Sequence, residues 1–299
     1  MTQLSNGCRI CPRQCGADRG GTPRLLRRGR TRHLCRPGCP APLGRTLHLR
    51  GNRLRGGLFQ RLSAALYLLP ELLHRPGPGG EAHHGGTPGG DFLELQQQHA
   101  ANINLVTPTH YTPQIITAVR SARAQGLAIP IVYNCGGYES VDTLRTLEGI
   151  VDIYLTDFKY MQSEPAERYS RAADYPQVAQ AALAEMVRQQ PEPRYDGAGM
   201  MTRGVLVRHL LLPGHVQNAK AVVKYVYETY GDRVWLSLMN QYTPLPQVRD
   251  YPEIDRKVTR HEYDRLIRYA LSLGVENAFI QEGGTAAESF IPAFDYQGL

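Results

Sequence analysis

The first residues of the chain contain thiols whose spacing suits metal ligation. Cys8, Cys11 and Cys15 form the pattern CxxCxxxC, and thiolates this close together hold zinc or an iron–sulfur cluster once a fourth ligand completes the site. Six cysteines in 299 residues are too few for a disulfide scaffold. The alternative to a metal site is three free thiols. No clear fourth ligand is present, although Cys35 or Cys39 could substitute.

Polar side chains also follow apolar runs that are typical of buried strands. Thr107 and Thr109 come after the run at 102–106, and Asn134 ends the run IPIVYN. Gly136 and Gly137 then follow, and glycines at such a point let the backbone approach a ligand closely. We therefore treat these residues as candidates for ligand binding. The alternative for each segment is an ordinary turn between a strand and a helix.

An acid and a base close the next apolar segment, VDIYLTDFK. Asp157 and Lys159 are two residues apart, so the alternation of a strand puts both side chains on one face. Such a pair could hold ribose hydroxyls or a carboxylate group. The alternative is a structural salt bridge.

Two further charged or titratable side chains interrupt the run GVLVRHLLL. Arg208 needs a partner or a ligand carboxylate in such apolar surroundings, and we expect it to contact a cofactor carboxylate. His209 points to the opposite face, where we expect a structural histidine. After the following strand come weaker candidates for the mouth of a pocket, namely Asn240, Gln241 and Tyr242.

The elements that position these residues alternate between strands and helices from residue 91 onward. Strands are predicted at 102–106, 129–133, 151–155, 204–212, 234–239 and 278–281. Helices are predicted from Thr112 to Gly126, after Ser140, and at 176–187, 218–230 and 260–273. This alternation predicts an α/β fold with a parallel sheet, as a barrel or an open sheet. Ligands bind at the carboxyl ends of the strands in both.

Residues 17–90 differ from the rest in composition. They hold a charge of +10, whereas the whole chain has +7, and no Val or Ile occurs between Ile10 and Ile103. Strands are therefore poorly supported, and Gly and Pro every few residues make helices poor too, so the segment is predicted to be disordered. Its arginines could bind nucleic acid, but Phe59 and Tyr67 are its only interleaved aromatics, so no such role is expected.

The composition also bounds the organisation and location of the chain. We expect a cysteine-containing segment at 1–19, an Arg/Gly/Pro-rich segment at 20–90 and a folded domain at 91–299. No run of 18 apolar residues supports a membrane span, and the first residues show no secretion signal. We therefore expect a cytoplasmic protein with no membrane partner.

Several long motifs resemble one enzyme family. The folded part and the first 19 residues look like radical SAM proteins related to pyruvate formate-lyase-activating enzyme. The motifs that carry the resemblance are CRICPRQCGADR (8–19), NINLVTPTHY (102–111), IPIVYN (129–134), VDIYLTDFKY (151–160), RGVLVRHLLLPG (203–214) and SLMNQYTP (237–244).

The resemblance implies a partial (β/α)6-type barrel that binds a [4Fe–4S] cluster and S-adenosylmethionine. It implies that Thr107 to His110 replace the family's GGE segment at the methionine end of S-adenosylmethionine. The loop after Asn134 would border this cofactor, and Asp157 with Lys159 would match the family's D-x-K. In the family, reduced flavodoxin or ferredoxin supplies an electron to the cluster, and S-adenosylmethionine is cleaved to methionine and a 5′-deoxyadenosyl radical. In activating enzymes that radical abstracts hydrogen from a glycine of a partner protein, so a glycyl-radical or other protein substrate is implied.

The cluster motif of this family, CxxxCxxC, is absent from the chain. Reading possible codons one base later permits cysteine at the positions of Leu62, Leu66 and Leu69, which have that spacing. Flanking residues then also permit the family's motifs in order. We therefore hypothesise that residues 22–90 are a frameshifted translation, and the alternative is a natural basic insert.

Three interpretations follow for the protein. It is an active radical enzyme altered by a sequencing error, an inactive frameshifted product, or an α/β protein whose basic insert binds RNA. As written, the chain has no catalytic residue in frame, and we expect poor solubility or partial folding, with the first barrel strand missing.

Overall fold

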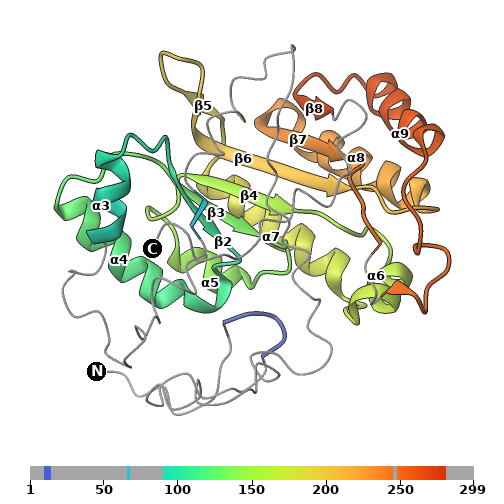
Figure 1. Ribbon diagram of the computed structural model, residues 1–299, viewed down its shortest axis with the longest axis horizontal. Coiled ribbons are helices and arrows are strands. Elements are labelled where there is room, and N and C mark those ends of the chain that lie inside the picture. The colour runs from blue at the N-terminus through green and yellow to red at the C-terminus, as the bar shows by residue number, and fades with distance from the viewer. Residues whose placement is uncertain (1–9, 15–65, 68–89, 245–247, 281–299) are drawn as a thin grey trace.

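The computed structural model describes residues 10–14, 66–67, 90–244 and 248–280. Its centre is an eight-stranded sheet that runs through the described part of the chain (Figure 1). Seven strands pair in parallel, in the order β1 (Leu66–Tyr67), β2 (Ile103–Val106), β3 (Ile131–Cys135), β4 (Ile153–Asp157), β6 (Met201–Leu210), β7 (Val234–Met239) and β8 (Ala278–Ile280). The short strand β5 (Arg194–Tyr195) pairs antiparallel with β6.

Helices connect the strands. The described helices are α3 (Gly90–Gln97), α4 (Thr112–Ala124), α5 (Val141–Thr146), α6 (Ser163–Ser170), α7 (Tyr175–Gln189), α8 (Val216–Tyr230) and α9 (Arg260–Ser272), with single 3-10 turns at η2 (Thr109–Tyr111) and η3 (Gly231–Arg233). Each is too short or too polar to cross a membrane, within the residues that the structure describes.

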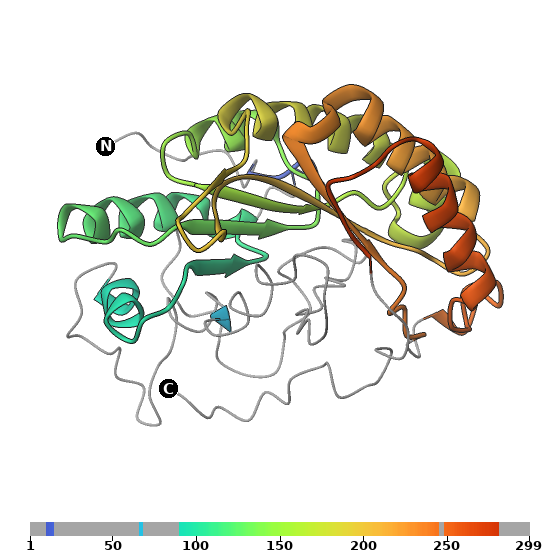
Figure 2. The ribbon, with the colours of Figure 1, turned by 90° about the horizontal axis from the view of Figure 1, so that it is seen from above.

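The order of the strands in the sheet follows the order of the chain, with no reversal. An open doubly wound sheet reverses its strand order at a switch point, whereas a barrel keeps one direction of winding. The sheet is curved, and α4, α7, α8 and α9 lie along its outer side (Figure 2). The prediction of an α/β fold with a partial barrel is therefore confirmed.

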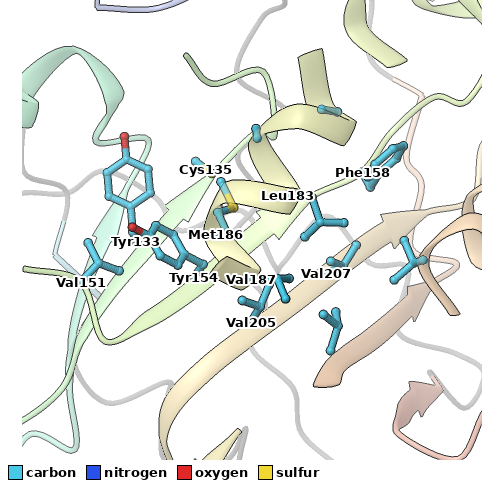
Figure 3. Close-up of a cluster of buried hydrophobic side chains, with 14 of the residues drawn as sticks. Tyr133, Cys135, Val151, Tyr154, Phe158, Leu183, Met186, Val187, Val205 and Val207 are labelled. Atoms are coloured by element: carbon cyan, nitrogen blue, oxygen red, sulfur yellow. The ribbon is translucent and has the colours of Figure 1, made fainter. Parts of the chain in front are cut away.

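The main core lies between the sheet and these helices. Alternate strand residues point outward into it, beginning with Ile103 and Leu105 on β2 and Tyr133 on β3. Figure 3 shows Leu183, Met186 and Val187 of α7 packed on outward residues of the central strands. A smaller apolar cluster occupies the other face of the sheet and consists of Val132, Ile153, Leu155, Met201 and Leu206.

Several boundaries differ from those predicted. The second and third predicted strands begin two residues later, at Ile131 and Ile153. Pro130 has no amide hydrogen, and its carbonyl accepts from Ile103 N just before β3 begins. Strand β6 begins earlier than predicted because the antiparallel pairing with β5 extends it. Ser140 is the N-cap residue of α5, as predicted, although its side chain makes no capping hydrogen bond.

The largest difference concerns the edge of the sheet. We expected the first barrel strand to be missing, but β1 pairs in parallel with β2 through Leu66 and Tyr67. Parallel pairing uses backbone groups, which a segment without Val or Ile also offers. Helices α3 and α6 were not predicted either. Residues 20–65 and 68–89 of the Arg/Gly/Pro-rich segment lie outside the described residues.

Candidate functional site

A buried ion pair joins the carboxyl ends of β4 and β6. Arg208 Nε donates to Asp157 Oδ1 at 2.8 Å, and Arg208 Nη2 is 2.7 Å from the same oxygen. The same Nη2 donates to Asn134 Oδ1 of β3 at 2.7 Å. Arg208 is only 7% exposed, so these two partners, rather than water, stabilise its positive charge. Three residues predicted separately from the sequence therefore meet at one place.

Lys159 lies beside this pair. Its Nζ is 3.7 Å from Asp157 Oδ2, a longer contact than those of Arg208, and its side chain is 20% exposed. The predicted placement of Asp157 and Lys159 on one side of the chain is what the structure shows. Together the three charged side chains sum to +1. The group thus has one cation more than its carboxylate can neutralise.

These charged side chains line a pocket at the carboxyl ends of the strands. The pocket is open to solvent, and the empty space within it, open solvent included, is about 700 Å³. Its wall combines the charged group with apolar and neutral polar side chains, namely Tyr160, Leu210, Leu212, Met239, Gln241, Tyr242 and Thr243. Two of the weaker candidates, Gln241 and Tyr242, therefore belong to the pocket. Asn240 does not line it.

The glycine turn after β3 lies close to the backbone at the end of β4, not to the open space of the pocket. Gly137 has a φ of +81°, and a Cβ there would overlap the carbonyl oxygen of Asp157. A Cβ on Gly136 would lie 3.8 Å from Lys159 Nζ. The turn therefore packs directly against the end of β4, and only glycine fits at Gly137.

The loop after β2 is hydrogen-bonded to β3 and to the loop that follows β3, where Glu139 supplies a buried carboxyl group. Thr107 N donates to Asn134 O at 2.8 Å, and Thr107 itself has a φ of +52°. Thr109 Oγ1 donates to Glu139 Oε1 at 2.8 Å. Tyr133 OH donates to Glu139 Oε2 at 3.4 Å. Neither threonine lines the pocket, so the structure places both beside the predicted site rather than in its wall.

Glu139 is a titratable residue that the sequence argument missed. It is 3% exposed, and this burial raises its pKa to about 7, against the lowering effect of the hydrogen bonds from Thr109 and Tyr133. The signal for it in the sequence was weak, because a glutamate before a helix is usually a surface residue. Only the packing of two loops shows that it is buried.

His209 occupies the opposite face of β6 from Arg208. It is buried, and its Nδ1 lies 2.7 Å from the carbonyl oxygen of Phe158. Burial lowers its pKa, which favours the neutral ring. Among the residues that the structure describes, His209 Nε2 has no hydrogen-bond partner. The side chain is absent from the pocket wall, as expected for a structural histidine.

The N-terminal thiols are described only in part. Cys11 belongs to a short turn in which Gln14 N donates to Cys11 O, whereas Cys8 and Cys15 lie outside the described residues. The turn is anchored near the carboxyl end of the sheet. Thr143 Oγ1 donates to Ile10 O at 2.6 Å. Arg13 donates to the carbonyl oxygens that end α6, at 2.6 and 2.8 Å.

The described residues contain no group of three or more metal-binding side chains. Cys135, the other described cysteine, is buried on the outer face of β3, and its thiol pKa is raised by that burial. Cys35 and Cys39 lie outside the described residues, as do the positions of Leu62 and Leu69. The predicted metal site at Cys8, Cys11 and Cys15 stays a prediction.

Comparisons with known proteins define a relative but no activity. No family model matches the chain. The chain is 26% identical over 179 residues to the uncharacterized protein MJ0674 of Methanocaldococcus jannaschii. The match covers 60% of this chain and 48% of that protein, so the chain spans about half the length of this curated relative. What the chain does must therefore be argued from the site itself.

Proposed function

We propose that this chain is the barrel of a radical SAM protein and binds S-adenosylmethionine in the pocket at the carboxyl ends of β4, β6 and β7. The observation that carries the proposal is the meeting of Asn134, Asp157, Lys159 and Arg208 at this edge. Each of these four residues is singled out by its place in the sequence. Three of them lie in β3, β4 and β6, Lys159 follows the end of β4 by two residues, and together they form one charged group.

The residues suit the chemistry of S-adenosylmethionine. The sequence predicts that Arg208 contacts the ligand carboxylate, but Arg208 is buried and already bonded to Asp157 and Asn134. Lys159 has the looser internal contact of the two cations and is the more exposed, so we assign the ligand carboxylate to Lys159 instead. Asp157 Oδ2 faces Lys159 and would accept from ribose hydroxyls. Leu210, Leu212 and Met239 offer an apolar wall for the adenine ring.

The [4Fe–4S] cluster does not fit the chain as written. Three thiolates at the family's spacing are required, and the sequence contains no CxxxCxxC. Cys11 and Cys135 cannot supply that set, because Cys135 is buried on the outer face of the sheet and its thiol contacts Thr156 Oγ1 at 3.5 Å. We therefore attribute the missing thiols to the frameshift hypothesised for residues 22–90.

The remaining parts of the proposal depend on that restored frame. Reduced flavodoxin or ferredoxin would be the electron donor, and a glycyl-radical or other protein would be the substrate. The protein would act in the cytoplasm, where thiols stay reduced. In the alternative proposal, the chain is an inactive frameshifted relative that keeps the barrel and the nucleoside pocket alone.

Two experiments test the proposal. Isothermal titration of the full chain with S-adenosylmethionine should show binding that Lys159→Met weakens about tenfold, as the loss of one charge-assisted contact implies. Lys224→Met, at an exposed position on α8, is the matched control and should bind as the unaltered chain does. If the unaltered chain does not bind S-adenosylmethionine, the proposal is wrong.

The second experiment concerns the gene. Resequencing across codons 15–95 should show one base gained or lost near each end of the segment. The restored chain, reconstituted with iron and sulfide, should show iron–sulfur absorbance in the visible range, and the chain as written should not. A confirmed frame together with cluster absorbance in the chain as written would contradict the frameshift hypothesis.

A further inference from the structure

Tyr175 is the first residue of α7 and lies between the two loops that form the site. It is only 2% exposed. Its ring packs against three other aromatic rings: Tyr138 lies parallel at 6.0 Å, and Phe158 and Tyr160 meet it edge-on at 6.4 and 5.4 Å. Because the ring is held on several sides, its hydroxyl has a fixed position.

The hydroxyl contacts backbone atoms of both loops. It accepts from Lys159 N at 3.0 Å, and its own hydrogen lies within reach of Gly136 O at 3.0 Å and Asp157 O at 3.3 Å. A tyrosine hydroxyl has one hydrogen, so the two carbonyl oxygens share it, while the hydroxyl oxygen accepts from the Lys159 amide. Burial raises the pKa of Tyr175 well above its usual value, which keeps this hydrogen in place.

Two of the three backbone groups belong to residues that line the pocket, and the third belongs to the turn after β3. Asp157 and Lys159 carry the carboxylate and the looser cation of the pocket, and Gly136 lies two residues after Asn134. Gly137 packs between the same groups, because a Cβ there would overlap Asp157 O and lie 2.9 Å from the Tyr175 hydroxyl. One hydroxyl therefore fixes the spacing between the ends of β3 and β4.

We propose that Tyr175 is a positioning residue for this site, whose hydroxyl joins the Gly136 carbonyl to the Lys159 amide and so holds the Asp157 and Lys159 side chains toward the pocket. Tyr175 does not line the pocket, so it acts through the backbone rather than on a ligand. The effect of Tyr175 on ligand affinity rests on the proposed binding of S-adenosylmethionine, whereas its effect on the Lys159 backbone does not.

The test compares Tyr175→Phe with Tyr154→Phe in the full chain. Tyr154 is also a buried tyrosine, but its hydroxyl donates to Gln189 Oε1 at 2.6 Å, on the outer side of the sheet away from the site. Each variant loses one buried hydroxyl, so a general loss of stability should affect both alike. Two readouts separate them: amide hydrogen exchange at Lys159 and the affinity for S-adenosylmethionine by titration calorimetry.

In Tyr175→Phe, exchange at Lys159 should accelerate and binding should weaken, each about tenfold, as expected for one lost hydrogen bond. Tyr154→Phe should leave both unchanged. Equal values for the two variants would overturn the inference. If the unaltered chain does not bind S-adenosylmethionine, the proposed function fails, and exchange at Lys159 alone decides the role of Tyr175.

If Tyr175→Phe does not fold, a measurement on the unaltered chain still decides. Lys159 lies beyond the end of β4, and its amide partner is the Tyr175 hydroxyl. Slow exchange at this amide is expected, and exchange at the rate of an exposed loop would overturn the inference.

Discussion

Replacing Arg208 with methionine should destabilise the barrel strongly. The change removes the partner of a carboxylate whose side chain is 14% exposed and the donor to the buried Asn134 Oδ1. Removing one member of a buried ion pair costs about 3–5 kcal/mol. Lys159 Nζ, already 3.7 Å from Asp157, can move closer and offset part of this loss. We therefore expect the free energy of unfolding to fall by about 3 kcal/mol.

Urea unfolding followed by fluorescence measures this change. Trp235 is the single tryptophan of the chain, and it lies on β7 beside Phe279, so its emission reports on the barrel. The control is Lys224→Met, which breaks an exposed pair at 3.8 Å and should change the free energy by less than about 0.5 kcal/mol.

A double variant separates the lost ion pair from lost packing. Asp157→Leu combined with Arg208→Met replaces the pair by apolar side chains, a change that is often neutral or stabilising for a buried pair. The double variant should therefore be more stable than Arg208→Met alone. The reasoning is refuted if Arg208→Met costs less than about 1 kcal/mol, or if the double variant is the less stable of the two.

Two further predictions concern the loops around the site. The pKa of Glu139 rises from 4.5 to about 7 on folding, so the folded state binds the proton more tightly; this stabilisation is complete below pH 4.5 and is lost as pH rises through 7. This stabilisation amounts to roughly 3 kcal/mol. In Glu139→Gln, urea unfolding measured across this pH range should no longer show this loss of stability with rising pH. An unchanged loss in the variant would assign the effect to another group. Gly137→Ala should lower the melting temperature much more than Gly149→Ala, because both glycines have positive φ but only Gly137 would place a Cβ against backbone. Equal shifts in the two alanine variants would mean that the turn can move away from Asp157.

The sequence by itself determined the fold class. The alternation of apolar runs with amphipathic segments and the turn signals at Thr112, Pro113 and Gly126 are local features. Helix α4 begins at Thr112 itself, with Tyr111 as its N-cap, one residue before the start that a cap at Thr112 predicts. Parallel strands joined by helices place their carboxyl ends at one edge. For this reason, the sequence alone singles out Asn134, Asp157, Lys159 and Arg208.

Only the tertiary structure decided which of these residues touch one another and what supports them. Sequence order does not show that Arg208 bonds to both Asp157 and Asn134, since the three residues come from separate strands. Nor does it show that a glutamate before a short helix is buried, or that Tyr175 bonds to two distant loops. Burial and long-range hydrogen bonds depend on how elements pack, and local residue patterns carry little of that information.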